Sequence, residues 1–268
     1  MNKLVIAALL VTQSLAGASP ASAVVIRHDV PDSAYLVPAD EFPALVDLPH
    51  EGHGVLISGQ WVVTAAHATQ WHPVSHVMIN GKWRSVEEVI VHPGYKSGPH
   101  VPPSGDTAPF MAIRAANDDI ALLKLSQPLA DVIPVAMHRT SNEQGHLGKL
   151  YGKGATGNGL DGQNMHSSHR SSLRRAYSRV SSADGKWLTY RFDASPQGHV
   201  LEGASGSGDS GGPLLIEVDG RATLAGLTSW QFATGDISEF QPGRYGQVSY
   251  LVRISHYASW IDDVIAAR

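Results

Sequence analysis

The chain has 268 residues, of which 43% are hydrophobic and 16% charged, and its formal net charge at pH 7 is −4. A chain of this length and balance buries a sizeable core in one large or two small domains, which excludes a disordered protein. The mild negative charge, with no stripe of Lys and Arg, argues against nucleic acid as a partner. With 0 Cys, the fold must hold without disulfides and no thiol chemistry is possible.

The first 23 residues have the pattern of a secretory signal peptide. Lys3 provides a short basic start, residues 4–10 are apolar, and residues 21–23 (Ala-Ser-Ala) form the cleavage site. Because residues 12–14 (Thr-Gln-Ser) interrupt the apolar run, a membrane-spanning helix fits less well, although a retained anchor is the alternative. We expect a secreted protein, extracellular or periplasmic, with no membrane contact after cleavage.

After Phe42 the first half of the chain shows short apolar or alternating runs between turn residues, which is typical of antiparallel strands. These runs are 54–58, 61–63, 77–79 and 86–91. Asn80-Gly81, between the last two runs, predicts a tight hairpin. Residues 97–116 then form a long excursion rich in Pro and Gly, and loops of that length are often functional.

The second half repeats the pattern of strands and turns, after a connection over residues 126–145. Its runs are 149–155, 173–180, 187–192, 214–216 and 224–230. Asp219-Gly220 predicts a hairpin between the last two.

Only the C-terminal end has a helical pattern. From Ser255, a candidate N-cap, apolar residues recur at steps of three and four, which predicts an amphipathic helix packed on a barrel. These apolar residues are Tyr257, Trp260, Ile261, Val264 and Ile265.

A serine between glycines precedes the run at 214–216: residues 208–213 are Gly-Asp-Ser-Gly-Gly-Pro. A nucleophilic serine needs a tight, open turn where a carbonyl can approach, and glycines leave that approach clear. They also leave backbone N–H groups free to face the oxygen that becomes negative during attack. Gly-x-Ser-x-Gly alone also fits a plain Gly-rich turn, but the full hexapeptide is far more specific.

This hexapeptide resembles the active-serine motif of trypsin/chymotrypsin-like serine proteases, a family whose chain order is His, Asp, Ser. Residues 61–67 (Trp-Val-Val-Thr-Ala-Ala-His) resemble its histidine motif, and residues 119–125 (Asp-Ile-Ala-Leu-Leu-Lys-Leu) resemble its aspartate strand. The resemblance implies an all-β fold of two six-stranded antiparallel β-barrels with a C-terminal α-helix. It implies three parts: a signal peptide over 1–23, an N-terminal barrel over 24–140, and a C-terminal barrel with the helix over 141–268.

The resemblance also implies a secreted serine endopeptidase whose triad lies between the barrels. His67 would take the proton of Ser210 and later give it to the leaving amine, since an imidazole titrates near neutral pH. Asp119 would hold the histidine tautomer; Asp118 is a rival by sequence alone, but the family's aspartate directly precedes the Ile-Ala-Leu-Leu strand. The backbone N–H groups of Gly208 and Ser210 would form the oxyanion hole.

Four residues are expected to contact the substrate or its pocket. Ala204, six residues before the serine, would lie at the pocket floor, where an Asp would favour Arg or Lys substrates. Ser229 would touch a buried aspartate and Trp230 would form a pocket wall. Gln231 replaces the family's usual Gly and would fill the pocket mouth. We therefore expect small or medium apolar side chains before the scissile bond, and no Arg/Lys specificity.

The resemblance further implies that an apolar N-terminus inserts into the body and pairs its ammonium with Asp209. Cleavage after residue 23 would create that terminus on Val24. The two glycines that usually follow the family's first apolar residues are missing, and the stretch to Phe42 is long. A short pro-segment, removed in a separate step, is therefore the alternative.

Two other functions fit parts of the sequence. An α/β-hydrolase esterase shares Gly-x-Ser-x-Gly but needs its Asp and His after the serine, in a fold of alternating strands and helices. A catalytically impaired protease-fold binding protein remains the alternative, because Gln231 and an unfilled N-terminal pocket would both impair turnover.

We expect a monomer that acts on polypeptides and uses no cofactor. We also expect no metal site, because the ligand-like pairs His72/His76 and His166/His169 have no acidic or cysteine cluster beside them.

Overall fold

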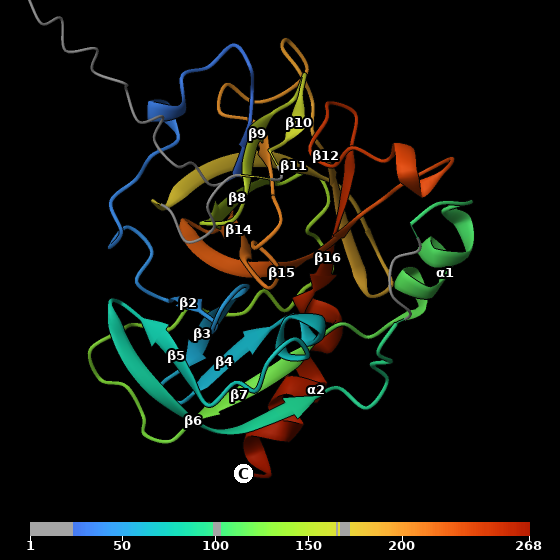
Figure 1. Cartoon of the computed structure of the whole chain (residues 1–268). Coiled ribbons are helices and arrows are strands. Elements are labelled where there is room, and N and C mark those ends of the chain that lie inside the picture. The colour runs from blue at the N-terminus through green and yellow to red at the C-terminus, as the bar shows by residue number, and fades with distance from the viewer. Residues whose placement is uncertain (1–23, 99–102, 165, 167–171) are drawn as a thin grey trace, which may run out of the picture.

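The computed structural model describes residues 24–98, 103–164, 166 and 172–268, so the predicted signal peptide lies outside the described residues. Two closed barrels of six strands each stand one above the other in Figure 1. All strand pairs within the barrels are antiparallel. This confirms the predicted all-β fold with two six-stranded barrels and a C-terminal helix.

The first barrel is built from the first half of the chain. Its strands, in spatial order, are β2 (Leu45–Asp47), β3 (His53–Ser58), β4 (Trp61–Thr64), β7 (Ala121–Leu125), β6 (Lys82–Val91) and β5 (His76–Ile79). The β5–β6 hairpin turns at Asn80 and Gly81, whose φ angles are 48° and 70°. Positive φ at both positions is what the tightest hairpin turn requires, so Asn-Gly forms it here.

The second barrel is built from the second half. Its strands, in spatial order, are β11 (Arg174–Asp184), β12 (Trp187–Arg191), β16 (Val248–Arg253), β15 (Arg221–Gln231), β14 (Pro213–Val218) and β8 (Leu147–Gly152). The β14–β15 hairpin turns at Asp219 and Gly220, again with positive φ.

A small sheet beside the second barrel takes in the start of the described chain. Its strands are β10 (Gly162–Gln163), β9 (Thr156–Asn158), β1 (Val24–Ile26) and β13 (Gly203–Ala204). β1 runs parallel to β9, with Val24 opposite Thr156, and antiparallel to β13, with Val25 opposite Ala204. Val24 and Val25 are buried, so their apolar side chains explain why this segment inserts there.

The prediction that only the C-terminal end is helical was wrong, because α1 (Ala108–Ala116) lies within the excursion at 97–116. Pro109 occupies the first turn, where its fixed φ suits a helix start and its missing N–H costs nothing. Phe110 and Met111 are buried in one small apolar cluster with Ala233. Short 3₁₀ helices are η1 (Asp32–Ala34), η2 (Ala66–Thr69) and η3 (Ile237–Glu239).

The C-terminal helix α2 (Ile254–Ala266) follows β16 but lies beside β6 and β7 of the first barrel (Figure 1). Tyr257 and Ile261 share an apolar cluster with Val62 of β4, and the Trp260 ring packs 4.8 Å from that of His92. The predicted N-cap was wrong: the helix begins at Ile254, and the Ser255 hydroxyl donates to Glu143 instead of capping it. Within the described ranges, no helix is long and apolar enough to cross a membrane.

Candidate active site

Three side chains from distant parts of the sequence meet between the barrels. His67 lies in η2, just after β4; Asp119 lies just before β7; and Ser210 lies in the loop between β13 and β14. The distance from His67 Nε2 to Ser210 Oγ is 2.8 Å, and that from His67 Nδ1 to Asp119 Oδ2 is 2.7 Å. The imidazole therefore contacts the hydroxyl with one nitrogen and the carboxylate with the other.

The residues around His67 fix its orientation. Ala65, Ala66 and Ala68 are buried, and their small side chains let η2 pack closely at the end of β4. The backbone N–H of His67 donates to Asp119 Oδ1 at 2.8 Å, so the carboxylate holds both the backbone and the ring of the same residue. The ring is thus held in one orientation toward Ser210.

Asp119 is 4% exposed and accepts a further hydrogen bond from the Ser229 hydroxyl. Burial alone would raise the pKa of its carboxyl, but the charge of His67 and the hydrogen bonds from His67 and Ser229 outweigh burial and lower that pKa. The rival Asp118 points elsewhere: its Oδ1 accepts from Lys186 Nζ and from the Tyr257 hydroxyl, each at 2.7 Å.

The loop before Ser210 leaves two donors available. Gly208 has a φ of 92°, a conformation that glycine adopts without strain. Within the described part of the chain, the backbone N–H groups of Gly208 and Ser210 donate to no protein acceptor. A Cβ on Gly211 would lie 2.2 Å from the His53 carbonyl oxygen, so that position has room only for glycine.

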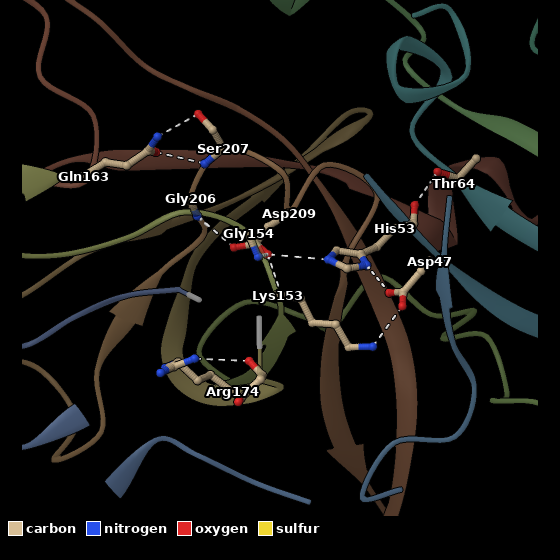
Figure 2. Close-up of polar contacts among 11 residues, drawn as sticks. Asp47, His53, Thr64, Lys153, Gly154, Gln163, Arg174, Gly206, Ser207 and Asp209 are labelled. Atoms are coloured by element: carbon tan, nitrogen blue, oxygen red, sulfur yellow. Dashed lines mark hydrogen bonds and ion pairs between the residues drawn. The ribbon is translucent and has the colours of Figure 1, made fainter. Parts of the chain in front are cut away.

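The intervening Asp209 is 1% exposed, so its carboxylate is buried in the protein. It accepts hydrogen bonds from the backbone N–H groups of Lys153, Gly154 and Gly206, and His53 Nε2 lies 3.7 Å from its Oδ1 (Figure 2). Val24 lies in β1 with residue 23 still bonded before it, so an ammonium on Val24 requires cleavage.

A pocket of about 230 Å³ opens beside Ser210, and three residues expected there, Ser229, Trp230 and Gln231, line it. Gln231 Nε2 donates to the Ser205 carbonyl oxygen at 2.9 Å. Ala204 is fully buried in β13 and does not line the pocket, whereas the next residue, Ser205, does. Among the described residues no Asp, Glu, Lys or Arg lines this pocket.

Sequence reasoning missed His53, Asp47 and Lys153, which contact Asp209 directly or through one another. The available signal was a histidine at the start of a strand whose central residues, 55–57, are apolar. Periodicity there predicts burial and says nothing of a partner.

The histidine pairs considered as metal ligands have other neighbours. The His72 ring packs 4.1 Å from that of His50, and the His76 ring 4.8 Å from that of Trp83. His169 lies outside the described residues. Across the described ranges, no group of three or more His, Cys, Asp or Glu residues is placed to hold a metal ion.

The comparisons with known proteins all point to one protein family. The family model described as Trypsin matches residues 35–261. Chymotrypsin-like elastase family member 1 of Homo sapiens is 28% identical over 236 residues, covering 82% of this chain and 83% of the relative. The same protein of Canis lupus familiaris is 29% identical over 245 residues, with 82% and 83% covered. Complement C1s subcomponent of Sus scrofa is 29% identical over 246 residues, covering 79% of this chain and 32% of that protein.

Proposed function

Because the chain belongs to the trypsin family of serine endopeptidases, we propose that it hydrolyses peptide bonds with His67, Asp119 and Ser210 as its triad. The observation that carries this proposal is the 2.8 Å contact of His67 Nε2 with Ser210 Oγ, with Asp119 on the other ring nitrogen. Serine is a weak nucleophile at its ordinary pKa, so a base at hydrogen-bond distance is the feature its chemistry needs.

In the first step, Ser210 Oγ attacks the scissile carbonyl carbon while its proton passes to His67 Nε2. The carbonyl oxygen becomes negative and accepts hydrogen bonds from the backbone N–H groups of Gly208 and Ser210, each worth about 3–4 kcal/mol in the transition state. Asp119 stabilises the imidazolium without taking its proton.

In the second step, the imidazolium of His67 protonates the leaving amine, the C–N bond breaks, and an acyl ester remains on Ser210. Water then replaces the amine: His67 removes its proton, the hydroxide attacks the ester, and the proton returns to Ser210 Oγ. The products are a new carboxylate end and a new amine end.

The test is labelling by a fluorophosphonate, which reacts only with an activated serine. We expect the secreted protein to be labelled at Ser210, and labelling to disappear in Ser210→Ala and His67→Ala. Ser141→Ala, which removes an exposed serine elsewhere, should be labelled as before. A folded wild-type protein that resists labelling would favour the alternative, a protease-fold binding protein without turnover.

We propose that the pocket takes small or medium apolar side chains. The Gln231 carboxamide reaches across to Ser205, which supports a narrowed mouth, and an uncharged lining offers no partner for Arg or Lys. Gln231→Gly should raise kcat/KM for a Leu- or Phe-containing peptide relative to its Ala analogue by roughly tenfold or more, a typical effect of added room in an apolar pocket. Faster hydrolysis of Arg than of Ala or Val peptides by the wild type would contradict this.

We also propose that export removes residues 1–23, and that the new ammonium on Val24 pairs with Asp209. Val24 has a φ of 68°, a costly conformation for a β-branched residue. Cleavage before Val24 removes the peptide bond that defines this angle, which relieves the strain. The N-terminal residue of the secreted protein tests this: any residue other than Val24 would mean that direct activation is wrong and would favour a pro-segment.

We further propose that the enzyme acts as a monomer and needs no cofactor. Its N-terminal barrel would comprise residues 24–140, and its C-terminal barrel with the helix residues 141–268.

A further inference from the structure

We infer that His53 is a positioning residue: it holds Asp209, and with it the donor groups of Gly208 and Ser210, from the side of the first barrel. This role rests on the proposed peptidase function. It concerns the loop before the serine and adds no group that touches the substrate.

The His53 side chain lies between two carboxylates at the start of β3. It is fully buried, with Nδ1 3.0 Å from Asp47 Oδ1 and Nε2 3.7 Å from Asp209 Oδ1. Figure 2 shows the imidazole bridging the two acids. Each ring nitrogen thus faces one carboxylate oxygen, so the polar ring offsets part of the cost of burying Asp209.

The same two acids are joined a second time through Lys153. Its Nζ lies 2.9 Å from Asp47 Oδ2, and its backbone N–H donates to Asp209 Oδ1 at 3.0 Å (Figure 2). Asp47 and His53 belong to strands of the first barrel, whereas Lys153 follows β8 of the second barrel. The four residues therefore close a polar ring across the junction between the barrels.

His53 also holds the serine loop through its backbone. Its N–H donates to the Ser210 carbonyl oxygen at 2.6 Å, and its own carbonyl accepts from Thr64 Oγ1 at 2.6 Å. The side chain thus acts on Asp209 and the main chain on Ser210, its immediate neighbour. Two adjacent residues of the loop are fixed by one residue of the first barrel.

This arrangement has a specific kinetic consequence. Gly208 and Ser210 flank Asp209 in sequence, so a rotation of Asp209 turns the peptide units whose N–H groups face the developing oxyanion. Those donors act mainly on the transition state, because the ground-state carbonyl carries little charge. Loss of the His53 side chain should therefore lower kcat and leave KM nearly unchanged.

The experiment compares His53→Gln, Asp47→Asn and the double variant with His138→Gln. His138 is a matched control: it is also a buried histidine, 3% exposed, but its Nε2 contacts Thr140 and not the ring of four residues. Active sites are counted by fluorophosphonate titration before kcat is calculated. We expect His53→Gln to lower kcat about 10- to 100-fold, less than the full loss of an oxyanion donor, with KM changed less than about threefold.

Inhibitor binding separates positioning from a purely structural role. A peptide aldehyde forms a hemiacetal oxyanion on Ser210, so its affinity should fall by the same factor as kcat. The corresponding product peptide, which forms no oxyanion, should bind unchanged. A structural defect would reduce the number of active sites or weaken both ligands alike.

Several results would overturn the inference: an unchanged kcat per active site, a rise in KM that accounts for the loss, or equal losses in His138→Gln. If His53→Gln does not fold, Asp47→Asn decides, because it keeps the side-chain shape and removes the charge that holds His53. The double variant should lose less than the product of the single effects, since both break one contact. Wild-type protein without fluorophosphonate labelling would instead refute the peptidase function itself.

Discussion

Asp119→Asn is expected to lower kcat by about 10⁴-fold at neutral pH, with a much smaller change in KM. An asparagine amide can donate to His67 Nδ1, which then favours the tautomer with its proton on Nε2. That nitrogen faces Ser210 Oγ at 2.8 Å and must be unprotonated to accept the serine's proton. Steady-state hydrolysis of a short apolar peptide measures the loss, with Ser210 labelling measured in parallel.

The neighbouring residue supplies the control. Asp118 bonds to Lys186 and Tyr257 and makes no contact with His67, so Asp118→Asn should keep kcat within about threefold of the wild type, as expected for a group outside the triad. A greater loss in Asp118→Asn than in Asp119→Asn would reverse the assignment of the triad acid.

The pH profile follows from the same contacts. The pKa of the Asp119 carboxyl is lowered, because the charge and hydrogen bonds of His67 outweigh the effect of burial. Asp119 therefore stays ionised well below neutral pH, so its own protonation should not limit the wild-type rate near neutral pH. The stability that Asp119 contributes is present above the ordinary Asp range and is lost as pH falls through the lowered pKa.

Arg253→Met is expected to reduce the free energy of unfolding by about 3–5 kcal/mol, the usual cost of leaving a buried partner uncompensated. Glu143 is fully buried, and Arg253 Nε and Nη2 donate to its two oxygens at 2.9 and 2.8 Å. Burial alone would raise the pKa of Glu143, but the hydrogen bonds from Arg253 and Ser255 lower it. Denaturant unfolding at neutral pH measures the difference.

An exposed pair of the same geometry provides the comparison. Arg139 donates two hydrogen bonds to Asp262, at 2.6 and 2.9 Å, but both side chains are about half exposed. Asp262→Asn should therefore cost only about 0–1 kcal/mol. The double variant Glu143→Leu/Arg253→Met should recover much of the stability lost in Arg253→Met. Equal costs for the buried and exposed pairs would contradict the role of burial.

The hairpins were predictable because their turns are local. Asn80-Gly81 and Asp219-Gly220 both adopt the positive φ angles that such dipeptides favour. The α1 helix was missed because Pro and Gly nearby suggested a loop, although Pro109 serves as a helix start. Ser255 was misread as an N-cap because its contact with Glu143 comes from a part of the chain far away in sequence.

In the candidate active site, too, some residues could be predicted from the sequence and others could not. Motifs at His67, Asp119 and Ser210 predicted which residues to examine, and the structure brings those three together. The contacts of Asp209 with His53 and Lys153 cross the barrel junction, where neither turn chemistry nor periodicity gives information. Ala204 was expected at the pocket floor, but Ser205 lines the pocket because successive residues of an extended chain face opposite ways.

The position of α2 sets the order in which a newly made chain can be completed. The helix follows the Ser210 segment in the chain, yet its Tyr257 and Ile261 share an apolar cluster with Val62 of the first barrel. Until these two residues have left the ribosome, the apolar surface that they cover stays exposed to water. The core of the barrel that carries His67 is therefore completed only after the Ser210 segment has been synthesised.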